Sequence, residues 1–137
     1  AEFAQPADGN HFSCVFVFHE QSKTVFCDDT LMYFDPSCFS GRCLCCCMPC
    51  IGGTLKMHPT TFDEDVSSGL VPMPESVDQF LAWAQGLIAD WDFDNLVTAH
   101  TGNKIGGAKN MLSELLASSA EPFAKLKRSF QDLQRKR

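Results

Sequence analysis

The feature that most constrains the fold is a pair of apolar segments separated by a short polar link. Residues 11–18 (HFSCVFVF) are rich in aromatic and β-branched side chains, and residues 24–27 (TVFC) repeat that composition after five polar residues. Such runs predict β-strands, and a polar connection of this length predicts a hairpin. Because both faces of the first strand carry apolar side chains, we expect this strand to lie inside a layered structure.

The clearest helix is predicted further along the chain. Apolar residues recur at spacings of three and four from Val77 to Trp91, which is typical of an amphipathic helix. Ser76 stands immediately before this stripe and Gln79 follows three residues later. This pair matches a capping box, so the helix is expected to begin at Ser76.

A short strand and two further helices complete the predicted order. Residues 95–99 (NLVTA) read as a strand, and a turn at 101–103 leads into a second helix with Ile105 on its apolar face. Pro122 suits the first turn of a third helix. An antiparallel hairpin, a later strand and three helices indicate a mixed α/β fold.

The length of 137 residues indicates one domain with a core of ordinary size. We interpret residues 1–10 as a flexible lead-in, of which residues 1–3 look like a cloning or processing scar. Residues 11–137 then form the domain, interrupted by a cysteine-rich loop at residues 36–53.

The charge distribution argues against nucleic-acid binding. Residues 125–137 carry a net charge of +5, whereas residues 1–124 carry −11. A nucleic-acid-binding protein is expected to spread its basic residues over one face, not to confine them to a tail. The tail fits a helix C-terminus whose cations complement the helix dipole, and the alternative is a contact with a partner or a membrane surface. No apolar run is long enough for a transmembrane helix.

Eight cysteines are numerous for this length, and the sequence alone does not assign their pairing. Structural disulfides, a zinc or iron–sulfur cluster, and free or lipidated thiols all remain open. Disulfides would reduce the unfolded-state entropy of a long loop with little apolar content, and they could also include Cys14 or Cys27. The clustered cysteines are Cys38, Cys43, Cys45, Cys46, Cys47 and Cys50.

Metal-ligand residue types stand at three predicted strand ends. His11 precedes the first strand, Asp28 and Asp29 follow the second, and His100 follows the third. Ends of neighbouring strands meet in space, and ligand sites in layered α/β folds gather there. Imidazoles and a carboxylate suit zinc or another divalent metal. The alternative is that both histidines are hydrogen-bonded at strand ends and that the aspartates cap a turn.

The hairpin segment resembles the second half of the metallo-β-lactamase fold superfamily. Residues 9–12 (GNHF) and 22–31 (SKTVFCDDTL) match a histidine before a strand and a return strand that ends in aspartate followed by Thr-Leu. Residues 96–102 (LVTAHTG) resemble the superfamily's final motif, a short strand that ends in a ligand histidine. The chain is closest to an uncharacterised branch found in bacteria, algae and plants.

This resemblance implies half of an αββα sandwich in which His11, Asp29 and His100 hold a metal. Asp28 would orient one of these ligands. The superfamily's main metal motif, H-x-H-x-D-H, is absent, and the other histidines, His19 and His58, are isolated. A missing N-terminal half or a second copy in a homodimer would therefore complete the fold.

Two functions follow from these patterns. The first is a metal-dependent hydrolase-like domain, incomplete or degenerate, in which a zinc or other divalent ion activates water. The second is a non-catalytic binding or structural module with a disulfide- or metal-stabilised cysteine-rich loop. No substrate can be inferred from the sequence, because it contains no nucleophile elbow, phosphate-binding loop or dinucleotide fingerprint.

Overall fold

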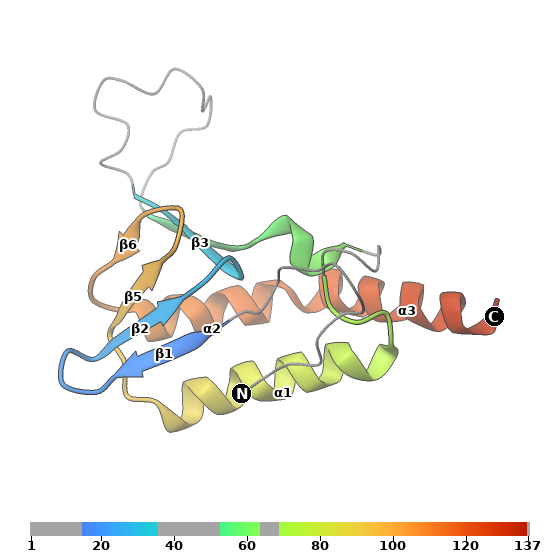
Figure 1. The fold of residues 1–137 in the computed structure, drawn as a ribbon, viewed down its shortest axis with the longest axis horizontal. Helices are drawn as coiled ribbons and strands as arrows, with labels where there is room; N and C mark the ends of the chain where they lie inside the picture. Colours follow the sequence, from blue (N-terminus) through green and yellow to red (C-terminus); the bar gives the residue numbers. More distant parts are fainter. Residues whose placement is uncertain (1–14, 36–52, 64–68, 137) are drawn as a thin grey trace, which may run out of the picture.

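The computed structural model describes residues 15–35, 53–63 and 69–136. Over these ranges the fold is mixed α/β, with a four-stranded sheet, a two-stranded sheet and three α-helices (Figure 1). In chain order the elements are β1 (Phe16–His19), β2 (Thr24–Cys27), β3 (Leu31–Phe34), β4 (Thr54–Met57), the 3-10 helix η2 (Pro59–Phe62), α1 (Pro74–Asp90), β5 (Asn95–Thr98), β6 (Asn103–Lys104), α2 (Ala108–Ser118) and α3 (Ala120–Arg135).

The larger sheet has the strand order β1-β2-β5-β6. Strands β1 and β2 form the predicted antiparallel hairpin. Strand β5 lies parallel to β2 with Leu96 opposite Val25, and β6 is antiparallel to β5. A parallel pair needs a long crossover connection, which here runs through β3, β4 and α1. The late strand predicted at residues 95–99 is therefore confirmed and lies at the centre of the sheet.

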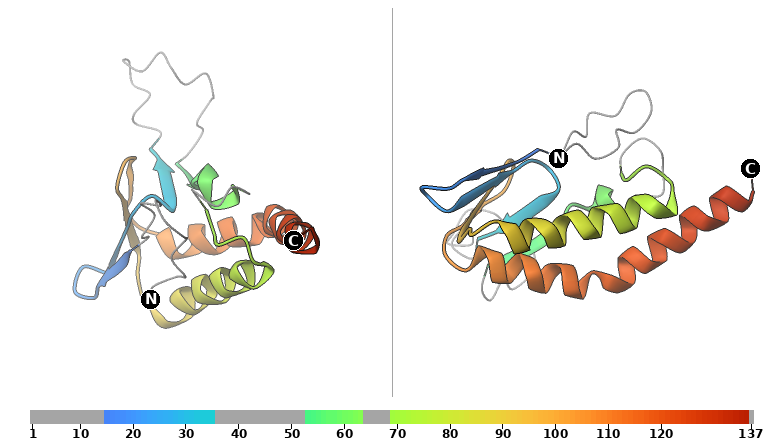
Figure 2. Two further views of the ribbon diagram at one scale, coloured as in Figure 1. Left: turned by 45° about the vertical axis from the view of Figure 1, so that its right-hand side comes forward. Right: turned by 90° about the horizontal axis from the view of Figure 1, so that it is seen from below.

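The three helices pack on one face of this sheet. Figure 2 shows α1 lying beside α2 and α3, which run in the opposite direction and follow one another with a break at Ser119. Aromatic pairs join sheet and helix: Phe16 meets Trp83 edge to face with centroids 4.8 Å apart, and Phe18 stacks on Trp91 at 5.5 Å. The most deeply buried large side chains of this core are Phe123, Phe130, Leu96, Val25 and Val77.

The opposite face of the hairpin is open to solvent. Val15, Val17 and Phe26 are 57%, 53% and 44% exposed, although all three are apolar. The expectation that both faces of the first strand would be buried is therefore wrong for the described residues. Alternation places these side chains away from the helices, because successive strand residues point to opposite faces.

A second sheet was not expected from the sequence. Strands β3 and β4 are antiparallel, with Leu31 opposite Met57 and Phe34 opposite Thr54. Their buried side chains face the core, and β4 contacts α2. Each strand has four residues, and residues 35–53 separate them, so no local hairpin signal was available.

The first helix begins earlier than predicted and lacks the capping box. Met73 is its N-cap and Pro74 its first residue, with no side-chain cap hydrogen bond. Proline presets the backbone angle at the first helical position, so the helix begins there. Ser76 consequently lies inside the first turn, where its buried hydroxyl has no hydrogen-bond partner in the structure. The predicted apolar stripe is confirmed, since Val77 and Phe80 are buried.

The second helix begins later than predicted. Gly106 and Gly107 have φ angles of +73° and +69°, which right-handed helices exclude, so α2 begins at Ala108. Ile105 lies outside the helix and is 71% exposed. The third helix contains Pro122 in its first turn, as predicted. Among the helices that the structure describes, none has the length and apolar content needed to cross a bilayer.

Candidate functional site

The parallel pairing of β2 and β5 brings two of the predicted ligands together. The two strands are in register from Thr24 opposite Asn95 to Cys27 opposite Thr98. Continuing this register by two residues places Asp29 opposite His100. Because both strands run in the same direction, both residues emerge at the same edge of the sheet.

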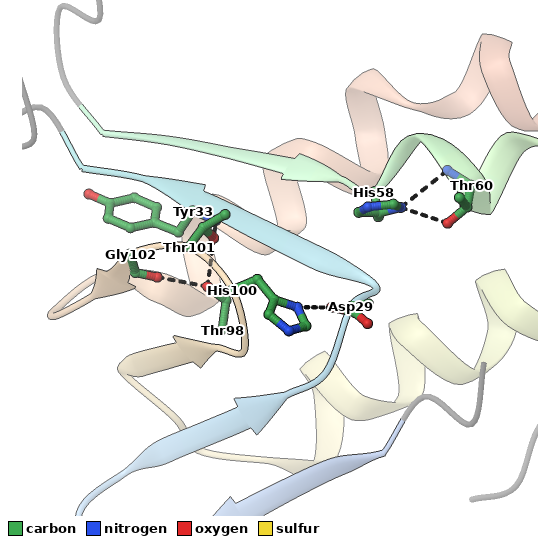
Figure 3. Close-up of polar contacts among 8 residues, drawn as sticks. All are labelled: Asp29, Tyr33, His58, Thr60, Thr98, His100, Thr101 and Gly102. Atoms are coloured by element: carbon green, nitrogen blue, oxygen red, sulfur yellow. Dashed lines mark hydrogen bonds and ion pairs between the residues drawn. The ribbon is translucent and has the colours of Figure 1, made fainter. Parts of the chain in front are cut away.

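The side chains of these two residues contact each other. The His100 ring nitrogen Nδ1 meets the Asp29 carboxylate oxygen Oδ1 across 71 residues of sequence (Figure 3). The His100 side chain is 74% exposed and that of Asp29 is 35% exposed. The carboxylate is therefore the more enclosed partner, and the imidazole projects from it toward solvent.

A network of hydroxyl and backbone groups holds the loop that carries His100. The Tyr33 backbone N–H donates to Thr101 Oγ1 at 2.8 Å, and the Gly102 N–H donates to the Tyr33 carbonyl at 2.7 Å. Thr98 Oγ1 donates to the Gly102 carbonyl at 2.8 Å and lies 2.7 Å from Thr101 Oγ1. His100 thus directly precedes two residues, Thr101 and Gly102, that are bonded to β3 (Figure 3).

Sequence reasoning did not identify this network. Thr101 directly follows the predicted ligand His100. The structure gives that threonine a definite partner in β3. The next residue is Gly102. A Cβ added there would lie 3.1 Å from the Tyr33 carbonyl oxygen in the neighbouring strand β3. The residues of the network, 98–102 (TAHTG), are visible in the sequence, but their role becomes clear only when their hydrogen bonds to β3 are known.

The turn that carries Asp29 is joined to β4. Its next residue, Thr30, is buried and accepts a 2.9 Å hydrogen bond at its carbonyl from the His58 N–H. The Thr30 hydroxyl is also buried and has no hydrogen-bond partner. The His58 ring accepts from the Thr60 N–H and lies 2.6 Å from the Thr60 hydroxyl, so it caps η2 and does not face the Asp29–His100 contact (Figure 3).

The structure does not place the other predicted ligands at the Asp29–His100 contact. His11 lies outside the described ranges, as do Cys38, Cys43, Cys45, Cys46, Cys47 and Cys50. Asp28 makes no hydrogen bond or ion pair with another described residue, so its orienting role stays a prediction. Within residues 15–35, 53–63 and 69–136, no three His, Cys, Asp or Glu side chains converge as a metal site.

Tyr33, which bonds to the His100 loop through its backbone, has a buried side chain. Burial raises the pKa of its phenol, and the nearby Asp35 carboxylate raises that pKa further. An added Cβ at Gly53 would overlap the Tyr33 hydroxyl, at 1.7 Å. Glycine at position 53 therefore leaves the space that the tyrosine ring occupies.

The glycine-rich turn before α2 is occupied by the chain's own side chains. Gly107 N–H donates to Asp94 Oδ1 at 2.6 Å, and Gly106 N–H donates to Asn95 Oδ1 at 3.0 Å. Because these amides already have acceptors, the turn positions α2 and does not present a free anion site.

Comparison with known proteins provides no further assignment. No family model matches this sequence. No curated protein and no solved structure shows significant similarity to it.

Proposed function

We propose that this chain is an incomplete or degenerate metallo-β-lactamase-like domain with a metal-dependent hydrolytic site at the carboxyl edge of its four-stranded sheet. The observation that carries the proposal is the contact between Asp29 and His100, which parallel register brings together from distant sequence positions. These are two of the three residues that the resemblance assigns to the metal.

The donor chemistry fits a borderline divalent cation. Zinc in catalytic sites takes three protein ligands of the His and carboxylate type and keeps one position for water. Asp29 and His100 supply two such donors, and His11 is the proposed third. A bound metal would lower the pKa of its water and so supply hydroxide for hydrolysis.

The arrangement of layers also supports half of an αββα sandwich. The sheet has helices on one face and exposed apolar side chains on the other, including Val17 and Phe26. In a complete sandwich a second sheet would cover such a face. A missing N-terminal half or a second copy of the chain would provide that cover.

Zinc binding to the full chain tests the proposal. Isothermal titration of the wild type and of His100→Ala should show binding that the substitution weakens by at least about 100-fold, because a ligand is lost. His19→Ala is the matched control, since His19 bonds to Ser22 in the hairpin turn and should leave binding unchanged. Absence of zinc binding, or equal binding by the wild type and His100→Ala, would contradict the proposed site.

A second candidate is a non-catalytic binding module. The exposed apolar strip formed by Val15, Val17 and Phe26 favours it, because large apolar side chains gathered on one face mark interaction surfaces. We expect self-association through this strip. Sedimentation over a range of concentrations should show dimers that Val17→Lys removes, whereas a strict monomer at high concentration would contradict this candidate.

A further inference from the structure

The two edges of the four-stranded sheet differ in how well they are protected. β6 forms one edge and is only two residues long, which leaves little backbone for another chain to pair with. β1 forms the other edge, and within residues 15–35, 53–63 and 69–136 only β2 pairs with it. Charged side chains and proline commonly protect a longer edge strand. Residues 15–19 (VFVFH) contain neither, so β1 is the edge suited to a further strand.

Helix α1 continues this uncharged surface into the helix layer. Phe16 contacts Trp83 and Phe18 contacts Trp91, so α1 packs directly against the edge strand (Figure 1). Residues 79–89 (QFLAWAQGLIA) of α1 carry no charged side chain, although several of them are exposed. The solvent-facing side of a helix usually carries charged and polar residues. An exposed side without charge therefore favours contact with a partner.

Gly86 lies in the middle of this uncharged part of α1. Glycine weakens a helix interior relative to alanine, so it usually serves a purpose there. A Cβ added at Gly86 would meet no atom within 4 Å, so the packing of the described chain does not require glycine at this position. The absence of a side chain lets another backbone come close. Gly86 thus leaves room for a neighbour that is not part of the same chain.

A second copy of the chain fits this surface. The chain carries a net charge of −6, so charged surfaces of two copies repel each other. The β1 edge and residues 79–89 of α1 can meet their own counterparts without placing like charges together. A two-fold axis perpendicular to the sheet brings identical edge strands together in antiparallel orientation. This is also the orientation in which β1 pairs with β2.

We propose that two copies of this chain associate through the edge of β1, with the two β1 strands antiparallel and the two α1 helices side by side. The two sheets then form one continuous sheet, and the outer backbone groups of β1 gain hydrogen-bond partners. This inference rests on the self-association expected for the second candidate function and specifies its contact. Strand edge meets strand edge, and Phe26, one strand further in, stays uncovered.

Sedimentation equilibrium of the full chain measures the dimer dissociation constant. A reductant is present, so that disulfides among the eight cysteines do not link copies. Val17→Lys places like charges on adjacent strands across the axis and should weaken the dimer by at least about 10-fold. Phe26→Lys is the matched control, because Phe26 is paired with Val17 and exposed on the same face. It should change the dissociation constant by less than about threefold.

Gly86→Leu tests the contact between the helices. Leucine favours helices and has open space at this position, so the single chain stays folded, as circular dichroism would confirm. Its side chain fills the space of the second α1, so the dimer should weaken by at least about 10-fold. No effect of Gly86→Leu, or equal weakening by Phe26→Lys and Val17→Lys, overturns edge pairing while the self-association of the second candidate stands. A strict monomer at high concentration overturns both.

Discussion

Replacing Thr101 with valine removes one hydroxyl from the network that holds the His100 loop. Valine keeps the branched shape of threonine, so the change isolates the hydrogen bonds. Thr98 already donates its single proton to the Gly102 carbonyl, and therefore Thr101 must donate in the 2.7 Å contact between the two hydroxyls. Thr101 Oγ1 also accepts from the Tyr33 N–H at 2.8 Å.

The expected loss of stability follows from these two bonds. The Tyr33 N–H would be left without its acceptor beside a buried strand, which costs about 1–3 kcal/mol, and the lost hydroxyl pair adds about 0.5–1.5 kcal/mol. Thr98 keeps its bond to Gly102, and Thr101 is only half-buried, so water can replace part of what is lost. We expect a net loss of about 2 kcal/mol in the free energy of unfolding.

Urea unfolding followed by tryptophan fluorescence measures this loss, because both Trp83 and Trp91 pack against β1. The melting temperature should fall by about 6–10 °C. Thr101→Ser keeps the hydroxyl and should lose much less. A valine variant within about 0.5 kcal/mol of the wild type, or a serine variant as unstable as valine, would refute the reasoning.

Three further tests probe other parts of the molecule. Leu96 is fully buried in β5, so Leu96→Ala should cost about 2–5 kcal/mol in chemical denaturation; a loss under about 1 kcal/mol would contradict its place in the core. Tyr33 is the single tyrosine, so the phenolate absorbance should titrate at a higher pH in the folded protein than in denaturant, where the midpoint is about 10. Since its folded pKa is raised, this group should lower stability as pH rises through the unfolded value, and coincident titrations would be evidence against its burial. Asp94→Ala removes the acceptor of the Gly107 N–H and should cost about 0.5–2 kcal/mol, with Asp94→Asn costing less, as thermal melts would show.

Elements whose signal is local were predicted well. The hairpin of β1 and β2, the strand β5 and the three helices follow from short-range alternation and helical spacing, and the apolar stripe of α1 packs into the core as predicted. The errors lie at boundaries and in one sheet. Two helices begin at other residues than predicted: α1 begins at Pro74, and α2 begins only after Gly106 and Gly107. Backbone geometry at these residues outweighs the apolar pattern.

The candidate site was predicted only in part. The residue types at strand ends indicated that Asp29 and His100 would meet, and they do. Thr98, Thr101 and Gly102 were not identified. Thr101 and Gly102 bond to β3, a four-residue strand whose pairing partner β4 lies beyond residues 36–52, and Thr98 bonds to these two residues. The exposure of Val17 was also unexpected, because the sequence shows that this side chain is apolar but does not show which part of the fold covers it.

The sequence by itself determined which residues could form strands and helices, because those preferences depend on neighbours within a few positions. It also placed a carboxylate and an imidazole after two separate strands. The parallel register of β2 and β5 decided that these two groups touch, and pairing with β3 decided how the histidine loop is held. Register depends on packing between segments more than 70 residues apart, and only the folded chain brings those segments together.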